Sequence, residues 1–324
     1  MIKFSHRATI ASIAALLVSI SANAAGVNWA SVPGKEVVLF YPGQSSWEWA
    51  LTPADMSGAE DFRKGKDCAT CHVGEEKDMG PQIVTGTPRV FKTGEKPSIE
   101  PTPIAGKPGV VSATVKLAND GTDLYVHIEF AEGAQPDSKQ DPAYATKVSV
   151  MFNDGKVPEA NRGGCFAACH DDSAGMASAG GANRTMYLSK TRAKITRQGG
   201  GDTLAAPDKL ASLQADGYQL EVWQALLNPG QPAKAASQII FDKRAAAPSN
   251  VVTAEATQSG GSWSVTIKRP LAAASPFSAI TAGNTYYLGF AIHSGHTAQR
   301  FHYVSYERSF SLNEGKTDLV AVKQ

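Results

Sequence analysis

Hydrophobic and polar residues alternate in a series of short runs from Val110 to the C-terminal end of the chain. Alternation with a period of two is typical of β-strands that bury one face, and the Gly, Asn, Asp and Pro residues between the runs are typical of turns. The positions that share a face within each run are Leu124, Val126, Ile128 and Phe130; Val148, Val150 and Phe152; Tyr218, Leu220 and Val222; Trp263, Val265 and Ile267; and Leu288, Phe290 and Ile292. The pattern predicts a mainly β fold, an antiparallel β-sandwich formed by residues 108–324.

The chain before residue 108 has less regular pattern. Residues 37–41 (VVLFY) predict a buried strand that ends at Pro42-Gly43, and residues 55–66 predict a short helix. Farther along, residues 208–214 predict another short helix. We expect residues 25–107 to form a small N-terminal segment of their own.

The first residues have the pattern of a secretory signal peptide. Lys3 and Arg7 precede a mostly apolar run over residues 8–20, and Ala22-Asn23-Ala24 has the form of a cleavage site. The apolar run is short for a membrane span, and no later run reaches the roughly 18 apolar residues that spanning requires. We therefore expect residues 1–24 to be removed and the mature chain to lie in the periplasm without a membrane anchor.

Charge and motif content exclude several classes of function. The chain has 31 basic and 30 acidic residues, and removal of Lys3 and Arg7 leaves 29 basic residues. This balance does not favour nucleic acid or an anionic membrane as partner. The sequence contains no nucleophile motif, phosphate-binding loop, dinucleotide fingerprint or dense carboxylate cluster. Whether the protein is an enzyme stays open, with more weight on a carrier.

The four cysteines fall into two clusters, each followed directly by a histidine. Residues 68–72 read CATCH, and residues 165–170 read CFAACH, with one additional residue between the cysteines. C-x-x-C-H is the attachment motif of haem c, because two nearby thiols can add to the vinyl groups of one porphyrin while the histidine becomes an axial ligand of the iron. The pattern predicts two haem c groups. The attachment residues are Cys68, Cys71, Cys165 and Cys169.

The cysteines also allow other kinds of site, mainly at the second cluster. A zinc site needs four soft ligands, and a redox dithiol does not need the histidine that follows Cys71. At the second cluster the alternatives are a disulfide between Cys165 and Cys169, zinc bound together with other residues, and haem held without both thioether bonds.

His72 and His170 are the predicted proximal ligands of the two irons. For the second iron, His302 is the candidate distal ligand, on a strand expected from residue 300 to residue 310 and pointing inward. For the first iron, Met56 is preferred. The competing candidates for the two distal positions are Met79, His293 and His296, whereas His127 is expected to be solvated.

Short motifs after residue 110 resemble the haem-binding subunit family of ethylbenzene dehydrogenase and related molybdenum enzymes of the DMSO-reductase type. They are VSVMFN at 148–153, MYL at 186–188, GYQLEVW at 217–223, GFAIH at 289–293 and RFHYVS at 300–305. The resemblance implies an Ig-like sandwich, similar to family 9 carbohydrate-binding modules, with haem at the edge of the sheets. That family holds b-type haem with Met and Lys. In place of the family's Met loop this chain has Cys165, Cys169 and His170, and in place of the family's Lys it has His302. The resemblance therefore implies a haem that is bound covalently and ligated by two histidines.

The sequence as a whole predicts a periplasmic dihaem c-type cytochrome that transfers single electrons between a redox donor and an acceptor. The partners considered are a molybdenum enzyme and a membrane quinol-oxidising cytochrome. One alternative is a haem subunit of a molybdenum oxidoreductase complex. Another is a small haem reductase or peroxidase with an open iron position beside Arg300 or Arg162, and a third is a ligand-binding sandwich.

Overall fold

The computed structural model describes most of the chain. The described residues are 26–45, 47–53, 56–86, 100–170, 186–195, 203–248 and 250–324, without the side chains of Glu48, Trp49 and Cys169. The predicted signal peptide lies outside these ranges, as does residue 55, where the first helix was expected to begin.

Thirteen strands of the described chain form one large sheet, most of it antiparallel. The strands of this sheet are β1 (Lys35–Phe40), β2 (Val110–Asn119), β3 (Asp123–Ala131), β4 (Thr146–Asn153), β7 (Leu220–Leu227), β8 (Lys234–Ile240), β9 (Arg244–Ala246), β10 (Thr253–Ser259), β11 (Ser262–Pro270), β12 (Tyr286–His293), β13 (Tyr303–Val304), β14 (Arg308–Leu312) and β15 (Leu319–Lys323). Their main order is β10-β11-β3-β2-β1-β13-β12-β4-β7-β8-β9, and β14 and β15 connect β12 to β2. The strand β15 is parallel to both β14 and β2.

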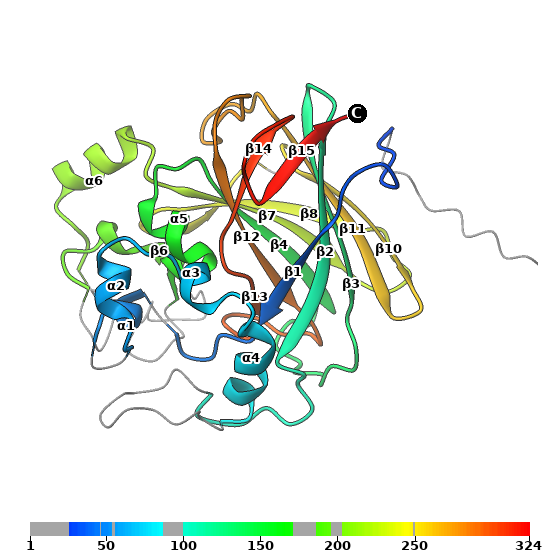
Figure 1. The fold of residues 1–324 in the computed structure, drawn as a ribbon, viewed down its shortest axis with the longest axis horizontal. Helices are drawn as coiled ribbons and strands as arrows, with labels where there is room; N and C mark the ends of the chain where they lie inside the picture. The colour runs from blue at the N-terminus through cyan, green and yellow to red at the C-terminus, as the bar shows by residue number, and fades with distance from the viewer. Residues whose placement is uncertain are drawn as a thin grey trace, which may run out of the picture.

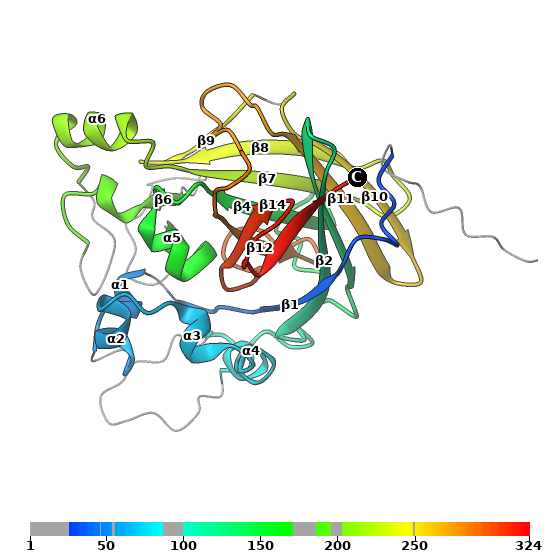
Figure 2. The ribbon, with the colours of Figure 1, turned by 45° about the horizontal axis from the view of Figure 1, so that its top comes forward.

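The sheet bends on itself, so that β10 and β11 lie against β7 and β8 (Figures 1 and 2). The result is the predicted sandwich of mainly β structure. The helices are α1 (Trp47–Ala50), α2 (Ala59–Arg63), α3 (Cys68–His72), α4 (Glu76–Val84), α5 (Pro158–Gly163) and α6 (Pro207–Ala215), with the 3₁₀ turns η1 (Gly164–Ala167) and η2 (Ser189–Thr191). A separate small sheet pairs β5 (Ala168–His170) with β6 (Met186–Leu188).

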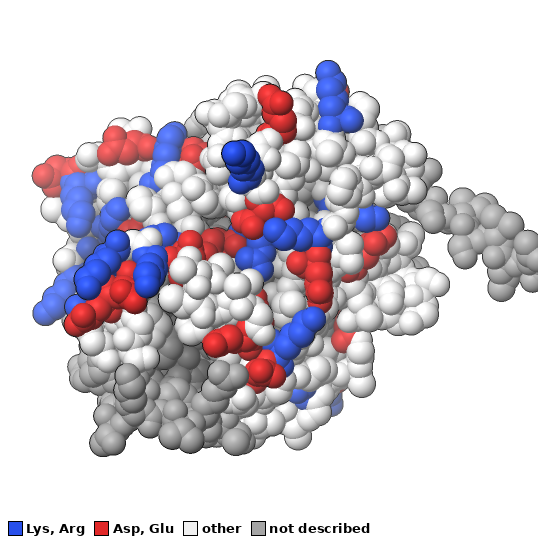
Figure 3. Space-filling view, viewed as in Figure 1, with Lys and Arg blue, Asp and Glu red and all other residues white. Residues whose placement is uncertain are grey.

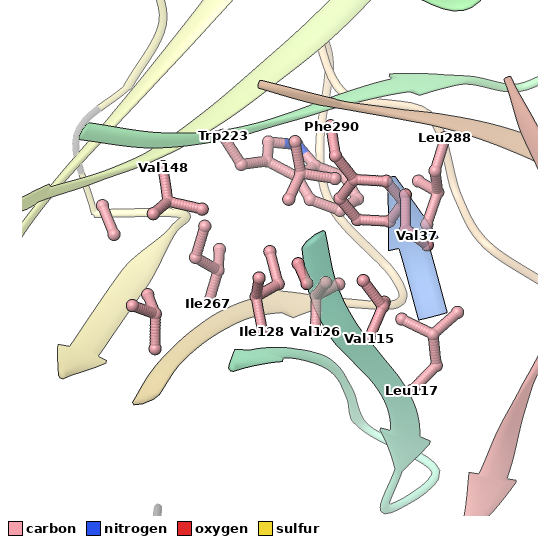
Figure 4. Close-up of a cluster of buried hydrophobic side chains, with 14 of the residues drawn as sticks. Val37, Val115, Leu117, Val126, Ile128, Val148, Trp223, Ile267, Leu288 and Phe290 are labelled. Carbon is pink, nitrogen blue, oxygen red and sulfur yellow. The ribbon is translucent and has the colours of Figure 1, made fainter. Parts of the chain in front are cut away.

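The core between the two layers is built from the alternating faces that the sequence predicts. All predicted positions on β3, β4, β11 and β12 are buried in one hydrophobic cluster. Figure 4 shows Val148, Trp223 and Phe290 from one layer facing Ile128 and Ile267 from the other. Because burial of apolar surface is the main driving force of folding, this cluster stabilises the sandwich.

Strand β7 is buried on both faces. Trp223, Ala225 and Leu227 enter the sandwich core, whereas Leu220 and Val222 belong to a second hydrophobic cluster on the outer side of the sheet. The predicted face of this run is therefore buried, but it does not line the sandwich core. One cysteine of each motif, Cys68 in the first and Cys165 in the second, packs against this second cluster.

The N-terminal segment is joined to the sheet. The predicted strand at 37–41 is β1, which pairs with β2 and contacts β13 through Phe40 and Val304. Helix α4 packs against β1 and β2, and α3 contacts α5. Helix α6 confirms the prediction at 208–214. No helix within the described residues is long and apolar enough to cross a membrane.

A buried ion pair connects the two layers between β7 and β11. The Nη2 atom of Arg269 lies 2.8 Å from Oε1 of Glu221, and both side chains are almost fully buried. The other carboxylate oxygen accepts from the indole N–H of Trp223 at 2.8 Å. Removing one partner from such a pair leaves an uncompensated charge in the interior.

We predict that Glu221→Gln lowers the free energy of unfolding by about 3–5 kcal/mol, because Arg269 then stays buried without its counter-charge. Urea denaturation followed by circular dichroism measures the change. The control is Glu36→Gln, because Glu36 pairs with Lys77 at 2.8 Å and both side chains are more than half exposed. Its expected effect is at most about 1 kcal/mol. Equal losses in the two variants would contradict the prediction.

Candidate functional site

The first cysteine motif forms the single-turn helix α3. The carboxylate of Asp67 accepts a hydrogen bond from the backbone N–H of Thr70 at 2.6 Å, which caps the start of the helix. Cys71 and His72 follow Cys68 by three and four residues, and helical residues at this spacing share a face. The motif therefore places two sulfurs and an imidazole on one side of a short helix.

The surroundings of the first motif are apolar on one side and open on the other. Cys68 is half-buried and packs at the edge of the second hydrophobic cluster, which also includes Trp47, Phe62 and the partly buried Met56. Burial raises the pKa of the Cys68 thiol well above its usual range. Cys71 is exposed. Met56 therefore packs against the same cluster as Cys68, and the competing Met79 lies on α4.

The second motif runs through η1 into β5. Cys165 lies in η1, and Cys169 and His170 lie in β5, so the additional residue of this motif falls at a change from a turn to a strand. Cys165 packs directly on β12 at Gly289, where an added Cβ atom would come within 2.8 Å of its sulfur. A glycine at this position therefore allows the second motif to lie against the sheet.

The described cysteines are free thiols. These are Cys68, Cys71 and Cys165, and burial raises the pKa of Cys165 to about 12. Among the described residues, no disulfide includes Cys165; the side chain of Cys169, its partner in the disulfide alternative, lies outside them. Within the described ranges, which leave out the side chain of Cys169, no group of three or more His, Cys, Asp or Glu side chains is arranged to hold a metal ion.

A cavity of about 890 Å³ lies next to the second motif. Its walls are the outer faces of β4, β7 and β12, the strands whose inner faces form the sandwich core. Ligand pockets in proteins typically measure about 300–1,000 Å³. The residues with relevant chemistry at its wall are Cys165, His170, His293, His302, Lys243 and Arg244.

Three histidines meet at this cavity. The ring of His302 lies 5.7 Å from that of His170 and 4.6 Å from that of His293. Burial, together with the positive charges of Arg244 and Arg300, lowers the pKa of His170 to about 4. Burial also lowers the pKa of His293 well below its usual range. These rings are therefore neutral at pH 7, which is the form that coordinates a metal.

Two of the three histidines bind the same backbone oxygen. The carbonyl of Gln299 lies 2.7 Å from Nδ1 of His302 and 3.1 Å from Nε2 of His293. The Nδ1 atom of His293 is buried and has no hydrogen-bond partner among the described residues. An orphaned buried nitrogen is costly unless something binds it. The cavity, the neutral rings and the adjacent thiol thus fit a haem group.

The structure corrects two expectations about histidines. His302 does not lie on a continuous strand from 300 to 310, because it precedes the two-residue strand β13 and the chain leaves the sheet again before β14. His127 is not solvated. It is buried, its Nδ1 lies 2.8 Å from the hydroxyl of Thr266, and its ring stacks on Trp29.

His296 is placed differently from the other two candidates for the second iron. Its Nδ1 lies 2.8 Å from the carbonyl oxygen of Asp141, and it does not line the cavity wall described above. The two arginines considered for an open iron position are already engaged. Arg300 forms a buried ion pair with Glu100, and Arg162 donates a hydrogen bond to the backbone oxygen of Phe62.

Aromatic rings join the two motifs. Tyr306 stacks on His72 with ring centroids 6.2 Å apart, and its other neighbours are Phe40 at 5.2 Å and Phe166 at 6.2 Å. Phe166 stands between the two cysteines of the second motif. The motifs are therefore neighbours in space although they are far apart in the sequence.

Beside the first motif lies a buried carboxyl group, that of Glu307. Its Oε1 accepts from the backbone N–H of Ala69 at 3.4 Å, and its Oε2 is buried without a hydrogen-bond partner in the described structure. Burial raises the pKa of Glu307 to about 8. Sequence reasoning missed both Tyr306 and Glu307, because nothing in their local pattern marks a contact with residues near 70.

Two cysteine pairs, each followed by a histidine, and a cavity lined by neutral imidazoles beside the second pair define a haem protein of the c-type cytochrome class. Two curated proteins match nearly the whole chain. It is 32% identical over 308 residues to cytochrome c-552 of Stutzerimonas stutzeri, a match that covers 93% of this chain and 92% of that protein. It is 24% identical over 297 residues to cytochrome c-551 of Rhodocyclus tenuis, covering 92% of this chain and 99% of that protein.

The chain belongs to the c-type cytochrome family that includes this cytochrome c-552. Haem c as cofactor and electron transfer as activity follow from this membership. No family model matches the chain.

Two solved structures share a weak likeness of fold. One is a putative carbohydrate-binding protein from Bacteroides uniformis, with a TM-score of 0.33, 10% identity and coverage of 63% of this chain and 72% of that one. The other is a family 9 carbohydrate-binding module from Caldicellulosiruptor kristjanssonii in complex with glucose, with a TM-score of 0.29, 10% identity and coverage of 60% and 66%. Neither likeness bears on function.

We predict that Glu307 makes a contribution to the stability of the protein that is lost as the pH rises from about 5 to 8. The folded protein keeps this carboxyl group protonated up to about pH 8, whereas the unfolded chain releases the proton near the ordinary value of 4.5. The stabilisation is therefore complete below pH 4.5 and is lost as the pH approaches 8. At low pH the urea midpoint of the wild-type protein should match that of the Glu307→Gln variant. At pH 8 the wild-type midpoint should be lower than that of the variant. Parallel curves would contradict the prediction.

Proposed function

We propose that the protein is a periplasmic dihaem c-type cytochrome that carries single electrons between a redox donor and an acceptor. The observation that carries the proposal is the proximity of the two cysteine-histidine motifs, which meet through Tyr306 and Phe166. When bound, haem iron supplies a one-electron couple between its ferrous and ferric states. Membership in the c-type cytochrome family supports this type of activity.

In this proposal each motif holds one haem. Cys68 and Cys71 form thioether bonds with the first porphyrin, and His72 is the proximal ligand. At the second site Cys165, Cys169 and His170 take the same roles, and the additional residue between the cysteines is accommodated by the passage from η1 to β5. Lys243 and Arg244 at the cavity wall are suited to carboxylate groups such as the haem propionates.

The distal ligands are proposed to differ between the two sites. Met56 serves the first iron, because it borders the cluster that contains Cys68. His302 serves the second iron, with His293 as the competing ligand at the same cavity. A methionine ligand raises the potential of haem iron relative to a second histidine. The first haem should therefore have the higher potential, which gives electrons a direction.

A haem subunit of a molybdenum oxidoreductase is the second candidate. The observation in its favour is that three of the motifs that resemble that family, at 148–153, 217–223 and 289–293, lie on or lead into β4, β7 and β12, which form walls of the cavity. Co-purification of the native protein with a large catalytic subunit would support this role, and isolation as a free cytochrome would support the shuttle.

Export and a protein partner are part of the same proposal. The segment before residue 25 is proposed to direct the chain to the periplasm, where cleavage after Ala24 gives the mature protein.

On the face shown in Figure 3, basic and acidic side chains are intermixed and neither sign covers a large area. This surface fits a redox protein better than nucleic acid.

We predict that the two haems are lost independently. Cys68→Ser with Cys71→Ser should remove the first haem and leave the second, and Cys165→Ser with Cys169→Ser should do the reverse. Haem staining after denaturing electrophoresis and intact mass measure the attachment. If the second pair of substitutions removes no haem, the second motif is not an attachment site and the dihaem proposal fails.

We predict that His302→Ala converts the second haem from a low-spin to a high-spin ferric spectrum, because the iron loses a strong-field ligand. The control is His296→Ala, whose ring binds the backbone of Asp141, and this variant should stay low-spin. Electron paramagnetic resonance and the optical spectrum measure the spin state. A high-spin spectrum in His293→Ala and a low-spin one in His302→Ala would assign the ligand to His293 instead.

A further inference from the structure

One short segment of the chain contacts both cysteine motifs. It begins at His302, on the wall of the cavity beside His170, and ends at Glu307, which accepts a hydrogen bond from the first motif at Ala69. Between them Tyr306 lies against the ring of His72 at a centroid distance of 6.2 Å and an angle of 23°. These few residues therefore extend from one proposed haem site to the other.

The second motif approaches the same segment closely. Phe166 lies 6.2 Å from Tyr306 at an angle of 31°. Gly164, just before Cys165, has a φ angle of +52°, and an added Cβ atom would lie 2.9 Å from the backbone nitrogen of Glu307. Only glycine adopts this conformation readily and leaves room for such an approach. The contact between the motifs is thus built into the backbone.

Two of the rings at this contact, those of Tyr306 and Phe40, are shielded from water, whereas Phe166 is partly buried. Tyr306 is 4% exposed and Phe40 is 3% exposed. Phe40 lies 5.2 Å from Tyr306 and 5.8 Å from Phe166, so that the three rings form one cluster. The pairing of Phe40 with Val304 fixes this cluster to the sheet. Charges interact more strongly across such a medium than across water.

We propose that Tyr306 and Phe166 are positioning residues that couple the two haem sites, so that the oxidation state of one iron alters the potential of the other. The proposal rests on the dihaem function proposed above. The coupling bears on the transfer of one electron from the ferrous iron at one site to the ferric iron at the other. No bond is formed or broken in this step and no proton is moved. Sites coupled in this way titrate as a pair.

The test is a redox titration of haem-loaded variants, followed by optical and paramagnetic resonance spectra. Tyr306→Leu removes the ring and admits water, and Phe166→Leu removes the opposite half of the contact. The measured quantity is the ratio between the electron affinity of one iron when the other is oxidised and its affinity when the other is reduced. In both variants this ratio should fall about threefold or more, which is the size of effect expected for coupling between contacting residues. Tyr306→Phe keeps the ring and should match the wild type.

Phe310→Leu is the control for a purely structural effect. Phe310 is also fully buried among aromatic rings, but it lies in the sandwich core beside Tyr286. It should lower stability without changing the coupling between the potentials. A coupling that is unchanged in Tyr306→Leu and Phe166→Leu, or reduced equally in Phe310→Leu, would overturn the inference.

Intact mass of the wild-type sample separates failure of this inference from failure of the proposed function. A protein with two attached haems and unaltered coupling in the variants would keep the dihaem function and refute the role of Tyr306. A protein with one haem would refute the dihaem function, and the coupling with it.

Discussion

The site depends on how the segment from His302 to Glu307 is held in the sheet. Val304 pairs with Phe40 on one side and with Ala291 on the other, so this part of the chain is fixed between β1 and β12. Because it is fixed, His302 reaches the cavity and Tyr306 reaches His72. The N-terminal segment that carries the first motif is thereby bound to the fold that carries the second.

The strands around the cavity have two roles. The inner faces of β4, β7 and β12 fill the sandwich core, and their outer faces form the cavity wall. The stability of the core therefore also gives the site a rigid wall, which is a general advantage of sites built on strands. At that wall, burial keeps His170 and His293 neutral and so available to a metal.

The sequence predicted the parts that depend on local pattern. Alternation placed the buried faces of β3, β4, β11 and β12 correctly, because one face of each strand meets a single apolar core. Alternation could not predict which face of β7 lines the sandwich core, because both faces are buried. Trp223 lies in the sandwich core and Leu220 lies in the second hydrophobic cluster. The spacing of the cysteines marked both motifs. Their proximity could not be predicted, because it depends on Tyr306 and on glycines that permit close approach of distant segments. His127 was misjudged for a similar reason, since Trp29 covers it from a distant part of the chain.

A two-centre electron carrier requires that both motifs bind haem covalently. Intact mass spectrometry of the denatured wild-type protein, produced in a host that attaches haem c, tests it most directly. The expected mass is that of residues 25–324 plus two haem groups. A mass corresponding to one haem, or to the polypeptide alone, would contradict it.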